Sequence, residues 1–345
     1  MLRFIPFKPD LDNASGGIMR FYYILLLITL ATTTVDAKKL TVYTYDSFVS
    51  EWGPGPIIEQ KFEDKYNIDL ELIAVDSAAT LLNKVILEGS NTKADIVLGL
   101  DMNLFDSADK SGLFINHSLD NLENDIMLPI KWDSKVFVPY NYGYFAFVYN
   151  NTKLLNPPKS MDELINSTDA RIVIQDPRTS TPGLGLLIWM KALYGNDAKN
   201  KWVKLNKKVI SVTKGWTDAY YNFFMAGEAD LVLSYSTSPA AHIMFEENYE
   251  ISAAIFEEGN YVSIEFAGIL KSSNNQRMAN NFLRFMISDD FQSVLPSTNI
   301  MYPIANNLML PEAFNKIEVP DMLQIDPEEI NKNKDEWINE WLNAS

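Results

Sequence analysis

The chain has 345 residues, of which 47% are hydrophobic and 12% aromatic, enough apolar material for one large or two medium globular domains rather than a disordered chain. Its formal net charge is −16 and its pI about 4.6, which argues against nucleic acid as a partner and favours small cations, although an acidic surface can also serve solubility alone. The sequence contains no cysteine, which excludes disulfides, Cys-ligated zinc, a thiol nucleophile and a lipid-modified cysteine.

The N-terminal segment has the pattern of a secretory signal peptide. Met19-Arg20 precedes the apolar run 21–31, and Val35-Asp36-Ala37 forms a small-x-small cleavage motif. The apolar run is too short to span a membrane. We therefore expect residues 1–37 to comprise an upstream extension (1–18) and a signal peptide that starts at Met19 and is cleaved after Ala37 during export.

From residue 39 onward, short apolar runs alternate with helical periods. The runs predict strands at 40–45, 68–75, 94–100, 171–174, 209–212 and 230–234. The helical periods predict helices at 56–66, 78–88, 182–194, 217–225 and 278–286, and a tail helix at 327–342 packed through Trp337 and Trp341. The alternation implies βαβ units and a mostly parallel sheet, so the predicted class is α/β.

Two long apolar stretches, 137–149 and 261–267, separate these sets and are predicted to cross between two lobes. We expect lobe 1 to consist of residues 38–140 and 268–345, and lobe 2 of residues 141–267. A ligand cleft is expected between the lobes, at the carboxyl ends of the strands, with a hinge in the crossing strands.

The clearest local signal is the start of the helix predicted at 182–194. Thr181 can cap it, Pro182 suits the first helical position, and Gly195 suits its end. Free backbone N–H groups together with the Ser180 and Thr181 hydroxyls form an anion or alcohol site, although an ordinary capped helix explains the same spacing. Glycines at 183 and 185 favour a close approach to this first turn.

Polar and aromatic residues follow other predicted strands. Tyr235, Ser236, Thr237 and Ser238 follow the strand at 230–234, where this architecture binds ligands or where a turn satisfies its own backbone. The aromatic residues near the remaining strand ends are Tyr43, Tyr45, Trp52 and Trp216. Ring faces suit a planar cationic heterocycle, although aromatic side chains are commonly core residues. Asp46 and Asp101 could pair with a cationic nitrogen or cap a helix.

Evidence for catalysis is thin. The histidines are His117 and His242, without metal-ligand spacing or a G-x-S-x-G elbow. The sequence also lacks a phosphate-binding loop and a dinucleotide fingerprint. We therefore expect a binding protein rather than an enzyme, without cofactor or metal.

These segments resemble the periplasmic thiamine-binding proteins of the bacterial thiamine ABC importer. The resemblance extends from about residue 39 to 307 and is carried by 40–48, 52–56, 93–101, 142–149, 175–187, 213–216, 231–239 and 301–303. It implies a two-lobed, periplasmic type II solute-binding protein that holds thiamine, its monophosphate or its diphosphate. It also implies delivery of this ligand to an ABC importer permease and its ATPase. We expect this protein to be monomeric.

The resemblance further implies roles for individual residues. Ser180 and Thr181 would meet the phosphate or hydroxyethyl end, Trp216 and Tyr235 would lie beside the rings, and the alcohols at 236–238 would donate hydrogen bonds. Tyr45 and Trp52 would be further walls from the other lobe. We also expect the ligand to contact Asp76, Ser77, Ala78 and, from its position at a strand end, Asp101. Two positions depart from the family pattern, which has Asp-Gly in place of Ser77-Ala78 and Trp in place of Ile300.

Two alternatives remain open. A ferric-ion receptor of the same fold could use the adjacent phenols of Tyr220 and Tyr221, although packing is their commoner role. A thiaminase-like transferase shares this architecture, but the enzymes of that class use a cysteine nucleophile and this sequence has none.

Overall fold

The computed structural model describes residues 39–166 and 169–344. The expected signal peptide, its cleavage site and the upstream extension lie outside these residues. No helix in the described ranges is long and apolar enough to cross a membrane.

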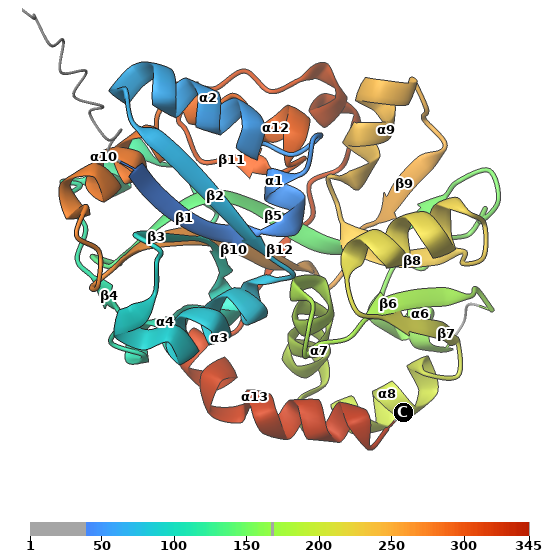
Figure 1. The fold of residues 1–345 in the computed structure, drawn as a ribbon. Coiled ribbons are helices and arrows are strands. Elements are labelled where there is room, and N and C mark those ends of the chain that lie inside the picture. The colour runs from blue at the N-terminus through green and yellow to red at the C-terminus, as the bar shows by residue number, and fades with distance from the viewer. Residues whose placement is uncertain (1–38, 167–168, 345) are drawn as a thin grey trace, which may run out of the picture. The chain divides into compact units, whose positions relative to one another are not determined.

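A mixed sheet forms the centre of the fold (Figure 1). Its strands are β1 (Lys39–Tyr45), β2 (Asp69–Val75), β3 (Ile96–Asp101), β4 (Phe114–Ile115), β5 (Phe137–Asn150), β6 (Ile172–Gln175), β7 (Val209–Thr213), β8 (Leu231–Tyr235), β9 (Ile251–Ala254), β10 (Asn260–Leu270), β11 (Tyr302–Pro303) and β12 (Met322–Leu323). The main order is β2-β1-β3-β10-β5-β8-β6-β7. We call β2-β1-β3 the first half of the sheet and β8-β6-β7 the second half.

Each half is parallel, and an antiparallel pair joins the halves. β1 runs parallel to β2 and β3, and β6 runs parallel to β7 and β8. Between them, β10 is antiparallel to both β3 and β5, and β5 is antiparallel to β8. β5 and β10 are therefore the long strands that the sequence predicts to pass from one half to the other.

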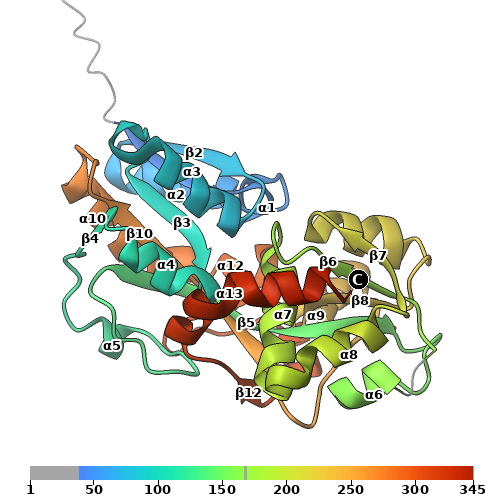
Figure 2. The ribbon, with the colours of Figure 1, turned by 90° about the horizontal axis from the view of Figure 1, so that it is seen from below.

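Helices cover both faces of the sheet (Figures 1 and 2). They are α1 (Asp46–Val49), α2 (Gly55–Tyr66), α3 (Ala78–Glu88), α4 (Phe105–Lys110), α5 (Leu122–Asp125), α6 (Met161–Asn166), α7 (Thr181–Tyr194), α8 (Ala198–Leu205), α9 (Ser238–Glu246), α10 (Gln276–Met286), α11 (Asp289–Gln292), α12 (Leu295–Thr298) and α13 (Pro327–Leu342). Short 3₁₀ turns include η1 (Gly89–Asn91), η2 (Met102–Leu104), η3 (Gly195–Asp197) and η5 (Glu312–Lys316), and η4 (Asp218–Met225) is a π-helix.

The continuous apolar runs in the sequence correspond to strands that are buried on both faces. Leu40 and Val42 of β1 pack into the same core as α2 and α10, whereas Tyr43 packs with α3. In β6, Ile172 faces the core that contains α7, and Val173 faces the core that contains η4. Because side chains alternate across a strand, both faces need apolar residues, which gives the unbroken runs.

The predicted α/β class, the strands and all the predicted helices but one are confirmed, with boundaries moved by one or two residues. The tail helix is α13, with Trp337 and Trp341 buried as predicted, and it contacts both α4 and α7. Two local predictions are wrong. The helix predicted at 217–225 is mainly the π-helix η4. Thr181 is the first residue of α7 rather than its cap, since Ser180 holds that position with an extended backbone.

The glycines in the first turn of α7 serve helix packing. A Cβ atom on Gly183 would lie 2.4 Å from the carbonyl oxygen of Gln175, and one on Gly185 would lie 2.1 Å from the ring of Phe145. The absent side chains therefore let α7 approach the sheet directly. This close contact fixes the helix N-terminus relative to β5 and β6.

We predict that Gly185→Ala lowers the free energy of unfolding by about 1–3 kcal/mol, because the new methyl group overlaps the fully buried ring of Phe145. Urea unfolding measures the change. Gly215→Ala is the control, because its Cβ atom would meet nothing within 4 Å. Equal stability of the two variants would contradict this account of α7 packing.

Candidate ligand-binding site

A cavity of about 800 Å³ lies where the carboxyl ends of parallel strands from both halves come together. It is lined by residues that end or directly follow β1, β2, β6, β7 and β8. Its volume is in the range of small-molecule sites. The position agrees with the rule that open α/β sheets bind ligands outside the carboxyl ends of their strands.

The first half of the sheet provides one wall. Tyr45 ends β1, and Asp46 begins α1 directly after it. Asp76 follows β2, and the Ser77 hydroxyl caps α3 by accepting a hydrogen bond of 3.3 Å from the backbone N–H of Thr80. Trp52, in the loop before α2, remains 53% exposed at the edge of the cavity.

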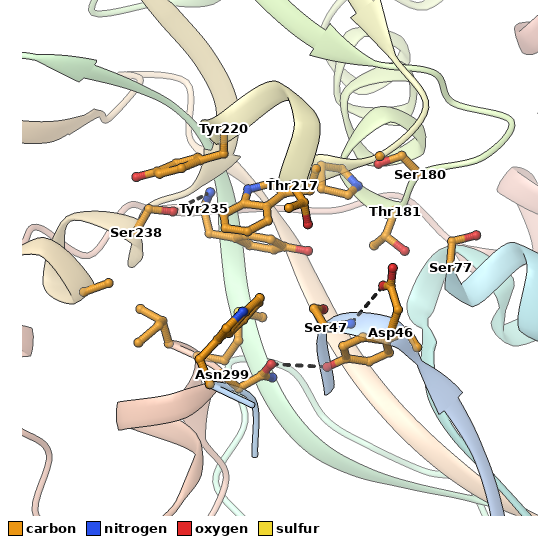
Figure 3. A pocket seen from close by; sticks show the side chains of 18 of the residues that line it. Asp46, Ser47, Ser77, Ser180, Thr181, Thr217, Tyr220, Tyr235, Ser238 and Asn299 are labelled. Carbon is orange, nitrogen blue, oxygen red and sulfur yellow. Dashed lines mark hydrogen bonds between the residues drawn. The ribbon is translucent and has the colours of Figure 1, made fainter. Parts of the chain in front are cut away.

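The N-terminus of α7 provides the facing wall. Figure 3 shows Ser180 and Thr181 at the same end of the cavity as Asp46 and Ser77, with Thr181 between Ser180 and Asp46. The Thr181 hydroxyl donates a 3.0 Å hydrogen bond to a carboxylate oxygen of Asp101, at the end of β3. This bond links the second half of the sheet to the first.

Aromatic side chains form the remaining part of the second wall. Trp216 follows β7, and its indole N–H donates to the Ser234 hydroxyl at 2.8 Å. Its ring stacks on Tyr220, with centroids 4.8 Å apart and planes 28° apart. Tyr235 ends β8 and packs against Phe145. Both aromatic rings are thus held by neighbours in fixed orientations beside the cavity.

The structure brings most of the sequence-predicted site residues together. Those that line the cavity are Tyr45, Trp52, Asp76, Ser77, Ala78, Ser180, Thr181, Trp216, Tyr235, Thr237 and Ser238. Asp101 and Ser236 are not among the lining residues. Asp101 is buried behind Thr181, where it caps η2 by accepting a 2.8 Å bond from the N–H of Asn103. Ser236 is buried in the turn after β8.

Tyr43 also lies outside the cavity, in the core below α3. By contrast, sequence reasoning missed Glu265, Asn299 and Met301, which line it. Glu265 stands in β10, in a strand whose other residues are all buried. An acidic residue inside the otherwise uncharged run 261–267 was a signal that could have identified it.

Glu265 is held by neutral donors. Its Oε2 atom accepts hydrogen bonds from the hydroxyls of Tyr45 at 3.0 Å and Tyr140 at 2.8 Å, and from the amide of Asn141 at 2.6 Å. Burial raises the pKa of the Glu265 carboxyl, and these hydrogen bonds oppose that rise. Burial likewise raises the pKa of Asp101 to about 6.

The cavity lining is acidic. Asp46, Asp76, Asp218, Glu246 and Glu265 contribute carboxylates, whereas Lys214 is the single lysine or arginine among the described residues that line it. Lys214 is exposed and forms an ion pair with Asp76 across the cavity mouth. An acidic, aromatic-walled cavity favours a cationic ligand with flat rings.

Two parallel α/β halves, joined by crossing strands around a cavity, define a two-lobed solute-binding protein. The family model described as bacterial extracellular solute-binding protein matches residues 91–333. The thiamine-binding periplasmic protein of Escherichia coli is 48% identical over 323 residues, which cover 93% of this chain and 98% of that protein.

Solved structures give the same assignment. A periplasmic thiamin binding protein superimposes with a TM-score of 0.86 at 46% identity, covering 95% of this chain and 99% of that one. A ferric binding protein from Campylobacter jejuni, with a TM-score of 0.75 at 22% identity over 89% of this chain and 99% of that one, shares the fold alone. The chain belongs to the bacterial extracellular solute-binding proteins and, within them, to the family of the thiamine-binding periplasmic proteins.

Asp101→Asn should stabilise the protein at about pH 8 by about 1–3 kcal/mol. Because the folded-state pKa of Asp101 is raised from 3.8 to about 6, the free energy of unfolding falls as the pH rises through this window. The asparagine oxygen keeps the bond from Asn103 without a buried charge. Urea unfolding at about pH 4 and about pH 8 should show the variant's advantage only at the higher pH, and equal or lower stability there would contradict the prediction.

Proposed function

We propose that this chain binds thiamine or a thiamine phosphate in the cavity and delivers it, from the periplasm, to an ABC importer. The observation that carries the proposal is the convergence of aromatic walls, acidic side chains and helix-end hydroxyls on one cavity. Membership of the thiamine-binding family supports the same ligand class.

Thiamine consists of a permanently cationic thiazolium ring, an aminopyrimidine and a hydroxyethyl arm that carries the phosphates. The rings of Trp216 and Tyr235 offer flat faces for stacking and cation–π attraction, and Tyr45 and Trp52 offer rings from the other wall. The acidic lining attracts the positive charge.

The start of α7 suits the hydroxyethyl or phosphate end of the ligand. The first backbone N–H groups of a helix have no intrahelical acceptor, and the helix dipole adds partial positive charge there. Ser180 and Thr181 add hydroxyls beside these groups. Lys214 also lines the cavity, and its carbonyl accepts a 2.7 Å hydrogen bond from the hydroxyl of Thr179.

Transport requires opening and closing rather than a covalent step. Two contacts join the halves across the cavity, the hydrogen bond from Thr181 to Asp101 and the ion pair of Lys214 with Asp76. The chain itself passes between the halves in β5 and β10. We infer that a monomer opens by bending at these strands, closes over the ligand, and presents the closed form to the permease and its ATPase.

The iron alternative receives no support from the phenols that suggested it. The Tyr220 hydroxyl bonds to His242 at 3.0 Å, and burial raises its pKa well above the ordinary value, which opposes a phenolate ligand. No group of three or more His, Cys, Asp or Glu in the described residues could hold a metal ion. The chain's relatives are binding proteins, and the family assignment makes it a binding protein rather than an enzyme.

Trp216→Ala should weaken thiamine binding by about 1–3 kcal/mol, because it removes one stacking face. Trp216→Phe is the matched control, since it keeps a ring but loses the indole donor to Ser234. Calorimetric titration with thiamine, its monophosphate and its diphosphate measures both variants. An unchanged affinity of the alanine variant would remove Trp216 from the site, and absence of thiamine binding by the unmodified protein would refute the proposed function.

Ile300→Trp should tighten thiamine binding, because Ile300 lines the cavity and an indole at this position adds a ring face worth about 0.5–2 kcal/mol. The φ of 54° at this position strains the β-branched isoleucine more than tryptophan or leucine, so the comparison is made with the leucine variant as well as with the unmodified protein. Competition titration against thiamine measures the change. Ile300→Leu keeps an aliphatic side chain of the same size and serves as the control. A tryptophan variant no tighter than the leucine variant would contradict the prediction.

A further inference from the structure

Glu265 is a buried carboxylate that lines the cavity with one oxygen uncommitted. Its Oε2 atom accepts from Tyr45, Tyr140 and Asn141, whereas Oε1 accepts no hydrogen bond from the described residues. Glu265 is 8% exposed, and it is one of the residues that line the cavity. Because buried polar atoms are normally paired, Oε1 is an acceptor available to a ligand.

No basic side chain balances this carboxylate within the described part of the chain. Its bonds come from two phenols and an amide, and the lysine of the cavity lining is paired with Asp76 at the mouth. A buried carboxylate without a cationic partner is costly, which indicates a role other than stability.

Strand pairing places a second acid beside it. In the β3–β10 register, Glu265 lies directly opposite Asp101, and like charges opposite one another destabilise a sheet. Both Asp101 oxygens are already engaged, one by the N–H of Asn103 and the other by Thr181. A donor or cation from the ligand would therefore relieve this repulsion at Glu265 rather than at Asp101.

Glu265 stands between the two ends of the cavity, because it lies opposite Asp101, the partner of Thr181, and shares the Tyr45 hydroxyl with Asn299. The Tyr45 hydroxyl contacts Glu265 at 3.0 Å and Asn299 Oδ1 at 3.3 Å, so the carboxylate and this amide oxygen belong to one group of acceptors. Figure 3 shows Asn299 on the side of the cavity away from Ser180 and Thr181. With the hydroxyethyl end at α7, as the proposed function has it, the aminopyrimidine reaches the acceptors.

We propose that Glu265 determines specificity for the pyrimidine end of thiamine, with Oε1 accepting an N–H from the amino group or the protonated ring nitrogen. This inference rests on the proposed function, and it assigns recognition of the heterocycle to a residue of the crossing strand β10. The thiazolium charge is then left to the aromatic walls and the carboxylates at the mouth.

The test compares thiamine with 3-benzyl-5-(2-hydroxyethyl)-4-methylthiazolium, which keeps the cationic ring and the hydroxyethyl arm but replaces the pyrimidine by benzene. Glu265→Gln should weaken thiamine binding about ten- to one-hundred-fold, since it removes a charge-assisted hydrogen bond. Binding of the benzyl analogue should change by less than about three-fold. Glu51→Gln, which removes an exposed carboxylate next to Trp52 and outside the lining, controls for net charge.

Equal weakening of both ligands by Glu265→Gln would overturn the inference, because it would show that Glu265 balances the thiazolium charge. Unchanged thiamine binding would also overturn it and leave the proposed function standing, whereas an unmodified protein that binds neither ligand refutes the proposed function itself. If Glu265→Gln does not fold, the unmodified protein decides: it must prefer thiamine to the benzyl analogue by about ten-fold or more, and equal affinities overturn the inference.

Discussion

The fold depends on the way β5 and β10 join two parallel half-sheets. Each half alone would be a small βαβ unit with strand ends open to solvent. The antiparallel pair orients the halves so that the carboxyl ends of β1, β2, β6, β7 and β8 meet at one cavity. Most residues that contact the ligand site are therefore the first residues after the strands. The sheet fixes their positions, and because they belong to loops their side chains are free to vary. The crossing strands also contribute directly, since Glu265 and its partner Asn141 belong to β10 and β5.

The cavity combines groups that oppose stability with groups that suit a cation. The Asp101 and Glu265 carboxylates lie opposite one another in the sheet, and burial raises the pKa of both. Fixed hydroxyl and amide donors hold these acids in place without neutralising them. Binding sites commonly keep such groups because their cost is offset only when the ligand arrives. The same arrangement explains why aromatic rings, which attract cations without carrying charge, form so much of the wall.

Much of the fold could be predicted from the sequence, because the spacing of apolar residues determines the strands and helices. The strands at 40–45 and 171–174 and the helix at 182–194 follow from apolar spacing and from Pro182 and Gly195. Most lining residues could also be predicted, since they follow strand ends. Three features depend on tertiary neighbours instead. Glu265 was missed because it lies within a strand rather than at its end. Asp101 was placed in the lining, whereas it lies behind Thr181. Gly185 was predicted to let a ligand approach the helix, whereas it makes room for the Phe145 ring.

Ile300 shows how the C-terminal part of the chain completes the cavity. Its φ of 54° is an outlier for a β-branched residue, and such strain persists only where the surroundings impose it. On one side, the backbone N–H groups of Asn299 and Ile300 both donate to the carbonyl of Leu295. On the other, Tyr302 pairs with Tyr142 of β5 in the β11 ladder. The chain must turn sharply between these anchors, and the turn places Ile300 and Met301 in the lining. A substitution at position 300 can therefore change the contact with the ligand, while the contacts of Leu295 and Tyr142 keep the backbone in place.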